Sequence, residues 1–143
     1  MAFVHTRDQL PRGIRNNNPL NIRENQRIDF DWEGELPIEV DDAFEEFVSP
    51  EYGFRAAARI LKSYSNRGVS TLEGIISRWA PAGDNNDVES YIASVQRNTG
   101  IDRYAVVGKA QYVDLMAAMT LHENGQQPYT RDVIARGVEL ANV

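Results

Sequence analysis

The chain has 143 residues, of which 42% are hydrophobic and 25% are charged, values that indicate one folded domain over 1–143 rather than a disordered protein. It has no cysteine and two histidines, which excludes disulfides, thiolate metal sites and a cysteine nucleophile, and argues against a multi-histidine metal site. The net charge of −6 disfavours nucleic acid as a partner, because phosphates require a basic surface. We expect neither a metal nor a cofactor.

The N-terminal stretch MAFVHTRDQLPRG lacks a basic segment followed by an apolar one, so no secretory signal is predicted. No run approaches the roughly 18 apolar residues of a membrane span, so no membrane insertion is expected. Residues 1–27 have no regular pattern, and 1–11 are a candidate flexible segment. The protein is expected to be made in the cytoplasm; if it acts outside, another machinery must deliver it.

Residues 12–23 have the sequence RGIRNNNPLNIR, with four asparagines among the six residues from Asn16 to Asn21. Asparagine favours neither helices nor strands, and a residue that precedes proline is biased away from the α conformation. Two interpretations follow. Either the segment is a turn, or its side-chain amides hold a ligand.

Residues 28–47 alternate loosely between apolar and acidic side chains, with interruptions at Gly34 and at Asp41-Asp42. This pattern predicts two or three short strands.

The rest of the chain predicts five helices, four of which begin at a polar capping residue. The expected starts are Ser49-Pro50-Glu51, Ser70-Thr71-Leu72-Glu73, Asn86-Asp87-Val88-Glu89, about Lys109, and Thr130. The first three helices are expected to end near Gly68, Pro81 and Gly100. The helix from Lys109 to His122 is the most apolar and is expected to be central.

Glu123 follows this apolar helix and precedes Asn124 and Gly125. Gly125 can adopt the left-handed conformation that ends a helix. The negative end of the helix dipole and apolar surroundings both disfavour a carboxylate, so the pKa of Glu123 should be raised. A protonated carboxyl group can act as the acid of a glycosidase. The alternative is a solvated residue at a helix end. His122-Glu123 does not continue as a HExxH zinc motif, because no second histidine follows.

Aromatic and acidic residues elsewhere offer further candidates. Trp79 and Tyr91 flank the polar loop AGDNND and could stack on sugars, although such residues more often belong to the core. His122 is interpreted as a cleft-wall or partly buried residue. A second catalytic carboxylate, which a hydrolase requires, could come from the acids of the strand region.

Four blocks of the sequence resemble a family of phage and prophage proteins that are often described as virion proteins: RGIRNNNPLNIR, FVSPEYGFRAAARIL, IISRWAPAGDNNDVESYI and LHENGQQPY. Members of that family commonly begin with a GIRNNNPGNIR-like stretch, and Leu20 stands here where glycine is usual. The blocks extend from Arg12 to about Gly137.

More distantly, the chain resembles flagellar-type glucosaminidases and lysozyme-like lytic transglycosylases, with the order of their blocks changed. Asn17 to Arg23 is similar to their NNLFNIK block, Trp32-Glu33-Gly34 to their WxG strand, and Trp79-Ala80-Pro81 with Tyr91 to their YATDP-Y segment. LMAAMTLHENG resembles their helix that ends in the catalytic glutamate, which comes first in those enzymes and last here. The resemblance implies a circularly permuted domain with Glu123 at the catalytic position.

The resemblance implies an α+β, mainly α, lysozyme-like fold with a small β lobe over residues 29–47. It implies cleavage of peptidoglycan glycan strands by a lytic transglycosylase, or by a muramidase or glucosaminidase with Asp31 or Glu33 as the second acid. The implied substrate-binding residues are Asn17, Asn18, Asn21, Tyr52, Trp79, Tyr91, His122, Asn124 and Tyr129.

The alternative function is that of a non-catalytic virion or tail protein that binds cell-wall glycan. In either case the expected partners are peptidoglycan strands and a phage particle or a secretion machine. Action at the bacterial cell wall would follow delivery, either as a free endolysin or as part of a particle.

Overall fold

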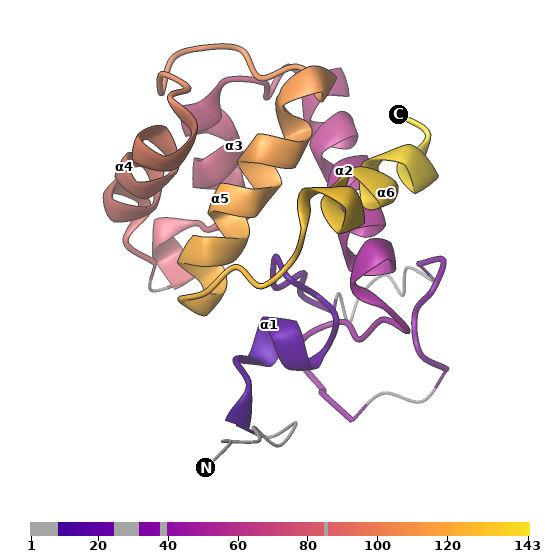
Figure 1. The fold of residues 1–143 in the computed structure, drawn as a ribbon. Coiled ribbons are helices and arrows are strands. Elements are labelled where there is room, and N and C mark those ends of the chain that lie inside the picture. The colour runs from indigo at the N-terminus through magenta and orange to yellow at the C-terminus, as the bar shows by residue number, and fades with distance from the viewer. Residues whose placement is uncertain (1–8, 25–31, 38–39, 85) are drawn as a thin grey trace.

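The chain is mainly helical, as predicted, in a computed structural model that describes residues 9–24, 32–37, 40–84 and 86–143 (Figure 1). The helices in chain order are α1 (Arg12–Arg15), α2 (Pro50–Asn66), α3 (Leu72–Trp79), the short 3-10 helix η2 (Ala82–Asp84), α4 (Val88–Thr99), the 3-10 helix η3 (Lys109–Gln111), α5 (Tyr112–Asn124) and α6 (Arg131–Ala141). Residues 1–8 of the segment predicted to be flexible, 1–11, lie outside the described residues.

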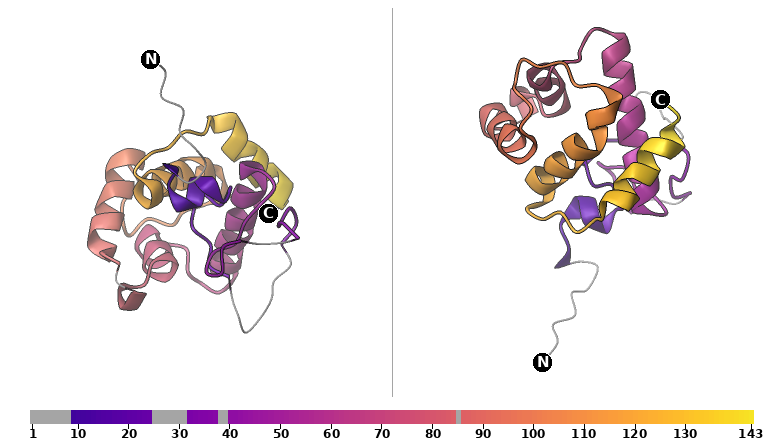
Figure 2. Two further views of the ribbon diagram at one scale, coloured as in Figure 1. Left: turned by 90° about the horizontal axis from the view of Figure 1, so that it is seen from below. Right: turned by 45° about the horizontal axis from the view of Figure 1, so that its top comes forward.

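Helix α5 lies at the centre of the helical part, as its apolar sequence predicts. It packs between α4 on one side and α6 on the other, and α6 in turn packs along α2 (Figures 1 and 2). Leu115, Met116 and Met119 of α5 are completely buried. A helix that is apolar on nearly every side can be stable in water only when other elements surround it.

The helix starts follow the local capping signals, with shifts of one residue. Pro50 begins α2, while Thr71 rather than Ser70 caps α3, and Asp87 rather than Asn86 caps α4. In each of the two shifted cases the capping oxygen accepts a hydrogen bond from the backbone N–H three residues later, which satisfies a donor that the helix leaves unpaired. Thr130 caps α6, as predicted.

The predicted β lobe is not built from strands in the residues that the structure describes. The segment forms two isolated antiparallel bridges, Arg23 with Phe44 and Glu35 with Phe47; residues 29–31 and 38–39 of the prediction lie outside the described residues. Side chains bind the backbone donors that a sheet would use. The Asp41 carboxylate accepts from the N–H groups of Ala43 and Phe44, and Glu46 accepts from those of Val40 and Asp41.

The asparagine-rich segment crosses the C-terminal end of α5 and joins the core. Leu20 is completely buried and Ile22 nearly so, and the Asn124 side chain at the end of α5 donates a 2.8 Å hydrogen bond to the Pro19 carbonyl. Figure 2 shows α1 lying against the same end of α5. The segment therefore belongs to the folded domain and places its side chains next to the residues that end α5.

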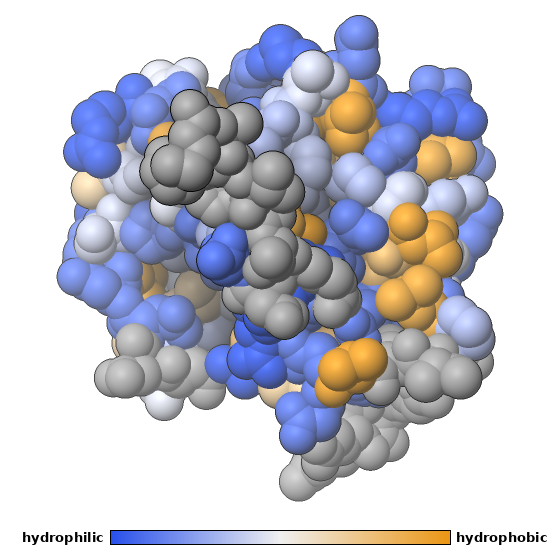
Figure 3. Space-filling model, turned by 60° about the horizontal axis from the view of Figure 1, so that its bottom comes forward, coloured by the Kyte–Doolittle hydropathy of each residue, from blue (hydrophilic) through white to orange (hydrophobic). Residues whose placement is uncertain are grey.

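The surface shown in Figure 3 carries mostly hydrophilic residues, with hydrophobic residues in separate small patches. No helix among the described residues has both the length and the apolar composition required to cross a bilayer.

Candidate active site

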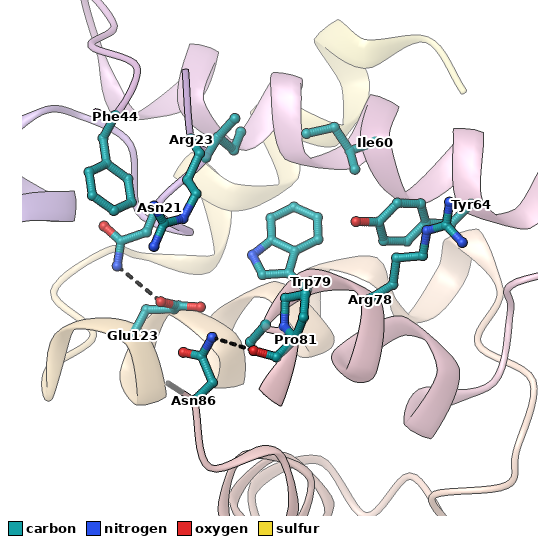
Figure 4. A pocket seen from close by; sticks show the side chains of 12 residues that line it. Asn21, Arg23, Phe44, Ile60, Tyr64, Arg78, Trp79, Pro81, Asn86 and Glu123 are labelled. Atoms are coloured by element: carbon teal, nitrogen blue, oxygen red, sulfur yellow. Dashed lines mark hydrogen bonds between the residues drawn. The ribbon is translucent and has the colours of Figure 1, made fainter. Parts of the chain in front are cut away.

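A cleft of about 410 Å³ opens between the asparagine-rich segment, α2, the end of α3 and the end of α5 (Figure 4). This volume lies in the range of small-ligand sites. Aromatic, aliphatic, amide and charged residues line it together: Asn21, Ile22, Arg23, Phe44, Ile60, Tyr64, Arg78, Trp79, Ala80, Pro81, Asn86 and Glu123. Glu123 contributes the one carboxylate among the described residues that line the cleft.

Glu123 lies in the last turn of α5, where the sequence predicted it. Gly125 ends the helix in the left-handed conformation with φ of 73°, a region that glycine enters without strain. The carboxyl group therefore lies at the negative end of the helix dipole, which disfavours its ionised form.

Two hydrogen bonds fix the Glu123 carboxyl group. Asn21 Nδ2 donates to Glu123 Oε1 at 3.0 Å, and the Tyr91 hydroxyl donates to Oε2 at 3.0 Å. Burial raises the pKa of Glu123, whereas the two hydrogen bonds and the positive charge of Arg23 act in the opposite direction; burial is the larger effect. The group is thus biased toward its protonated form, and its neighbours can still stabilise the carboxylate after it gives up the proton.

The absence of a side chain at Gly13 leaves room for the Asn21 amide beside α1. Asn21 has a positive φ of 53°, which asparagine tolerates better than most residues. A Cβ atom at Gly13 would lie 2.7 Å from Asn21 Oδ1 and 2.6 Å from Asn124 Oδ1, too near for either side chain to keep its place. Glycine at this position therefore permits the two amides to approach α1.

Tyr91 joins α4 to the end of α5. Its side chain is almost completely buried, and the His122 ring stacks on it with centroids 4.0 Å apart and an interplanar angle of 27°. Burial lowers the pKa of His122, which favours the neutral ring. His122 does not line the cleft; it holds the Tyr91 ring in place.

An ion pair supports the opposite wall. Arg12 donates two hydrogen bonds of 2.6 Å to the Asp41 carboxylate, and Asn16 Nδ2 donates a third of 2.9 Å. These contacts hold the pKa of Asp41 well below its usual range. The Arg12 guanidinium also lies 4.4 Å from the centre of the Phe44 ring, so this network positions an aromatic residue of the cleft.

A comparison with curated proteins gives a phage relative, while no family model matches the chain. The chain is 46% identical over 133 residues to protein P5 of Pseudoalteromonas phage PM2, which covers 92% of this chain and 82% of the relative. The chain belongs to the P5 family. This relationship agrees with the prediction, made from the sequence, that the chain resembles phage proteins.

In this P5-family chain, two of the four clustered asparagines, Asn17 and Asn18, hold the protein's own backbone, as does Asn124 at the end of α5. Asn18 is completely buried and therefore cannot contact a substrate; of the two roles considered for this cluster, it takes the structural one. Asn17 Nδ2 donates to the Phe47 carbonyl, and Asn124 Nδ2 donates to the carbonyls of Pro19 and Thr120. Neither Asn17 nor Asn124, both predicted to bind substrate, lines the cleft.

Three other predicted site residues do not line the cleft. The Tyr52 ring packs over Gly34, and Tyr129 packs edge-to-face on Phe54 with centroids 5.3 Å apart. Glu33 forms a 2.9 Å ion pair with Arg55 on the surface. Asp31 lies outside the described residues.

Sequence reasoning missed much of the cleft wall. Of the predicted residues, Asn21, Trp79 and Glu123 line it; Arg23, Phe44, Ile60, Tyr64 and Arg78 were not predicted. Tyr64 and Ile60 occupy α2 one helical turn apart, which is a spacing that could have indicated a shared face. Arg23 and Arg78 had no local signal.

Three carboxylates lie together elsewhere, with ligand atoms of Glu24, Glu35 and Glu45 all within 4.8 Å of one another. Oxygen ligands of this kind suit Ca²⁺ or Mg²⁺. Acidic groups also gather on protein surfaces without an ion, and we assign this cluster no role.

Replacing Tyr91 by phenylalanine should move the pH dependence of any activity that requires protonated Glu123. The hydroxyl favours the carboxylate, so its loss should raise the pKa of Glu123 further and shift the alkaline fall in activity to higher pH. Loss of one hydrogen bond, worth about 1 kcal/mol, should also reduce the rate roughly fivefold. A rate loss with an unshifted pH profile would show that Tyr91 acts only through packing.

Proposed function

We propose that this P5-family protein cleaves the glycan strands of peptidoglycan as a lytic transglycosylase, with Glu123 as the general acid and then the base. The observation that carries the proposal is the Glu123 carboxyl group, which faces a cleft, has a raised pKa and is held on both oxygens. Aromatic and amide groups beside it suit the faces and the acetamido groups of amino sugars.

In the first step Glu123 gives its proton to the oxygen of a β-1,4 bond between two amino sugars. The bond from that oxygen to the anomeric carbon breaks, the departing sugar keeps the proton as a hydroxyl, and positive charge develops on the remaining ring. Asn21, Tyr91 and the charge of Arg23 stabilise the Glu123 carboxylate that forms.

In the second step the carboxylate takes a proton from the 6-hydroxyl of the same ring. The freed oxygen bonds to the anomeric carbon and closes a 1,6-anhydro ring, which returns Glu123 to its protonated form. Hydrolysis would instead require a base for water. Glu33 is paired with Arg55 away from the cleft, so the described acids favour the anhydro outcome.

The proposal extends to the fold and to delivery. A helical core around α5, faced across a cleft by the segment that contains Asn21 and Phe44, is consistent with a circularly permuted lysozyme-like domain. A phage relative is consistent with action on the host cell wall, either from a particle or as a free endolysin.

Digestion of purified peptidoglycan sacculi in water enriched with heavy oxygen tests the proposed chemistry. Mass spectrometry should find soluble fragments with anhydro ends and no incorporated heavy oxygen. Reducing ends that carry heavy oxygen would indicate hydrolysis, and Glu33→Gln would then show whether Glu33 supplies the second acid. Release of no fragments at all would leave a glycan-binding virion protein as the better description.

A further inference from the structure

The cleft has the opposite charge to the protein as a whole. The chain carries a net charge of −6, yet the charged side chains that line the cleft are Arg23, Arg78 and Glu123. Two arginines and one glutamate give the lining a positive net charge even when Glu123 is ionised.

Arg78 lies at the end of the cleft away from Glu123. Figure 4 shows its guanidinium beside the Tyr64 ring, with Trp79 between this pair and Glu123, and the guanidinium carbon lies 5.9 Å from the centre of the Tyr64 ring. The residue is exposed, and the described residues provide no carboxylate within 4 Å of it. Arg55 and Arg103, in contrast, are bound by glutamates.

Arg23 occupies the other side of Trp79, next to Asn21 (Figure 4). Its guanidinium carbon lies 5.1 Å from the centre of the Phe44 ring, and Arg12 lies over the same ring at 4.4 Å. Arg12 is neutralised by Asp41, whereas Arg23 has no ion-pair partner among the described residues. Stacking on Phe44 fixes the planar group and leaves its donors for a ligand.

We propose that Arg23 and Arg78 bind carboxylates of the substrate on the two sides of Trp79, so that the cleft selects acidic glycan. This inference rests on the proposed glycan substrate. The guanidinium fork matches a carboxylate with two parallel hydrogen bonds. In peptidoglycan such groups occur on the lactyl substituent of the muramoyl sugar, once its peptide has been removed, or on the stem peptide. Phosphates of nucleic acid would offer similar chemistry, but the acidic protein as a whole repels them.

Calorimetric binding measurements with three oligosaccharides test the inference without requiring cleavage. The ligands are a neutral N-acetylglucosamine oligomer, peptide-free muramoyl strands with lactyl carboxylates, and muramoyl strands that retain their peptides. At low salt the protein should bind at least one carboxylate-bearing ligand about fivefold to tenfold more tightly than the neutral oligomer. The preferred acidic ligand identifies which carboxylate is bound.

Arg78→Gln should weaken binding of the preferred acidic ligand roughly fivefold and leave the affinity for the neutral oligomer unchanged. Arg97→Gln, which removes the same charge from an exposed position on α4, is the matched control and should change neither. Equal affinity for neutral and acidic strands, no binding to any strand, an equal effect of the control, or tighter binding of a single-stranded oligonucleotide would each overturn the inference. A selective binder that releases no fragments would instead refute the proposed catalysis alone.

Discussion

Glu123→Gln is expected to abolish the release of fragments from purified cell walls while the protein stays folded. Glutamine can still accept the Asn21 hydrogen bond through its oxygen, but it cannot transfer a proton to a glycosidic oxygen. Loss of a general acid–base group reduces rates by about 10² to 10⁴. In a mechanism where one residue performs both proton transfers, the loss should lie at the upper end of that range.

The same substitution should change how stability depends on pH. Because the folded pKa of Glu123 is raised above its unfolded value, the folded state binds the proton more tightly, and the free energy of unfolding falls as pH rises between those two values. Glutamine does not titrate, so the variant lacks this pH-dependent loss of stability. The variant should therefore have a melting temperature at neutral pH equal to or above that of the wild type.

Glu139→Gln provides the matched control, since it removes the same charge from an exposed residue on α6 that is paired with Arg136. It should leave fragment release unchanged. Clearing of cell walls by Glu123→Gln at a wild-type rate would end the assignment of Glu123 as the catalytic acid. A large drop in its melting temperature would instead show that the carboxyl group has a mainly structural role.

Asn18→Ala is expected to produce the largest loss of stability among the asparagine substitutions. The completely buried Asn18 side chain donates to the carbonyls of Ile22 and Glu45 and accepts from the Ile22 N–H, at 2.9 to 3.0 Å. Alanine would leave the Ile22 N–H and the Glu45 carbonyl without partners, whereas the Ile22 carbonyl would keep its hydrogen bond from the Glu45 N–H. The free energy of unfolding should fall by roughly 3 kcal/mol or more, a large part of the stability of a typical domain.

Thermal and urea unfolding followed by circular dichroism will measure this loss, and a decrease in melting temperature of about 10 °C is expected. Asn98→Ala is the matched control, because the Asn98 amide donates a single hydrogen bond at an exposed position on α4. If Asn18→Ala melted like the control, the buried amide would not be holding the segment in place. A fully stable variant that lost glycan binding would restore the ligand-holding role that its burial argues against.

Local sequence determined the longer helices of this protein. Pro50, Thr71, Asp87, Thr130 and Gly125 act through bonds or dihedral angles within a few residues, so their effect can be recognised without knowledge of the fold. The segment over residues 28–47 was harder to predict. Its alternation indicates strands, but the Asp41 and Glu46 carboxylates take up backbone donors, and only coordinates reveal that competition.

The catalytic candidate could be found from sequence, because an acid placed between an apolar helix and a terminating glycine is unusual by itself. Its surroundings could not be found in that way. The asparagine cluster permitted two interpretations, and the structure divides it: Asn18 holds backbone, whereas Asn21 reaches Glu123 from 102 positions away. Both are asparagines within four residues, so residue type alone could not separate their roles.

The sequence by itself determined where the capped helices begin, to within one residue, that the helix predicted from Lys109 to His122 is central, and that Glu123 stands at its end. It did not indicate α1, which lies in a segment predicted to be irregular. Tertiary structure alone decided that Tyr91 is a buried donor, that Arg23 and Arg78 give an acidic protein a cationic cleft, and that Tyr52 and Tyr129 lie elsewhere. The physical reason is the range of the interactions. Capping and helix periodicity act between neighbours in sequence, whereas a cleft is formed by packing segments that are far apart in the chain.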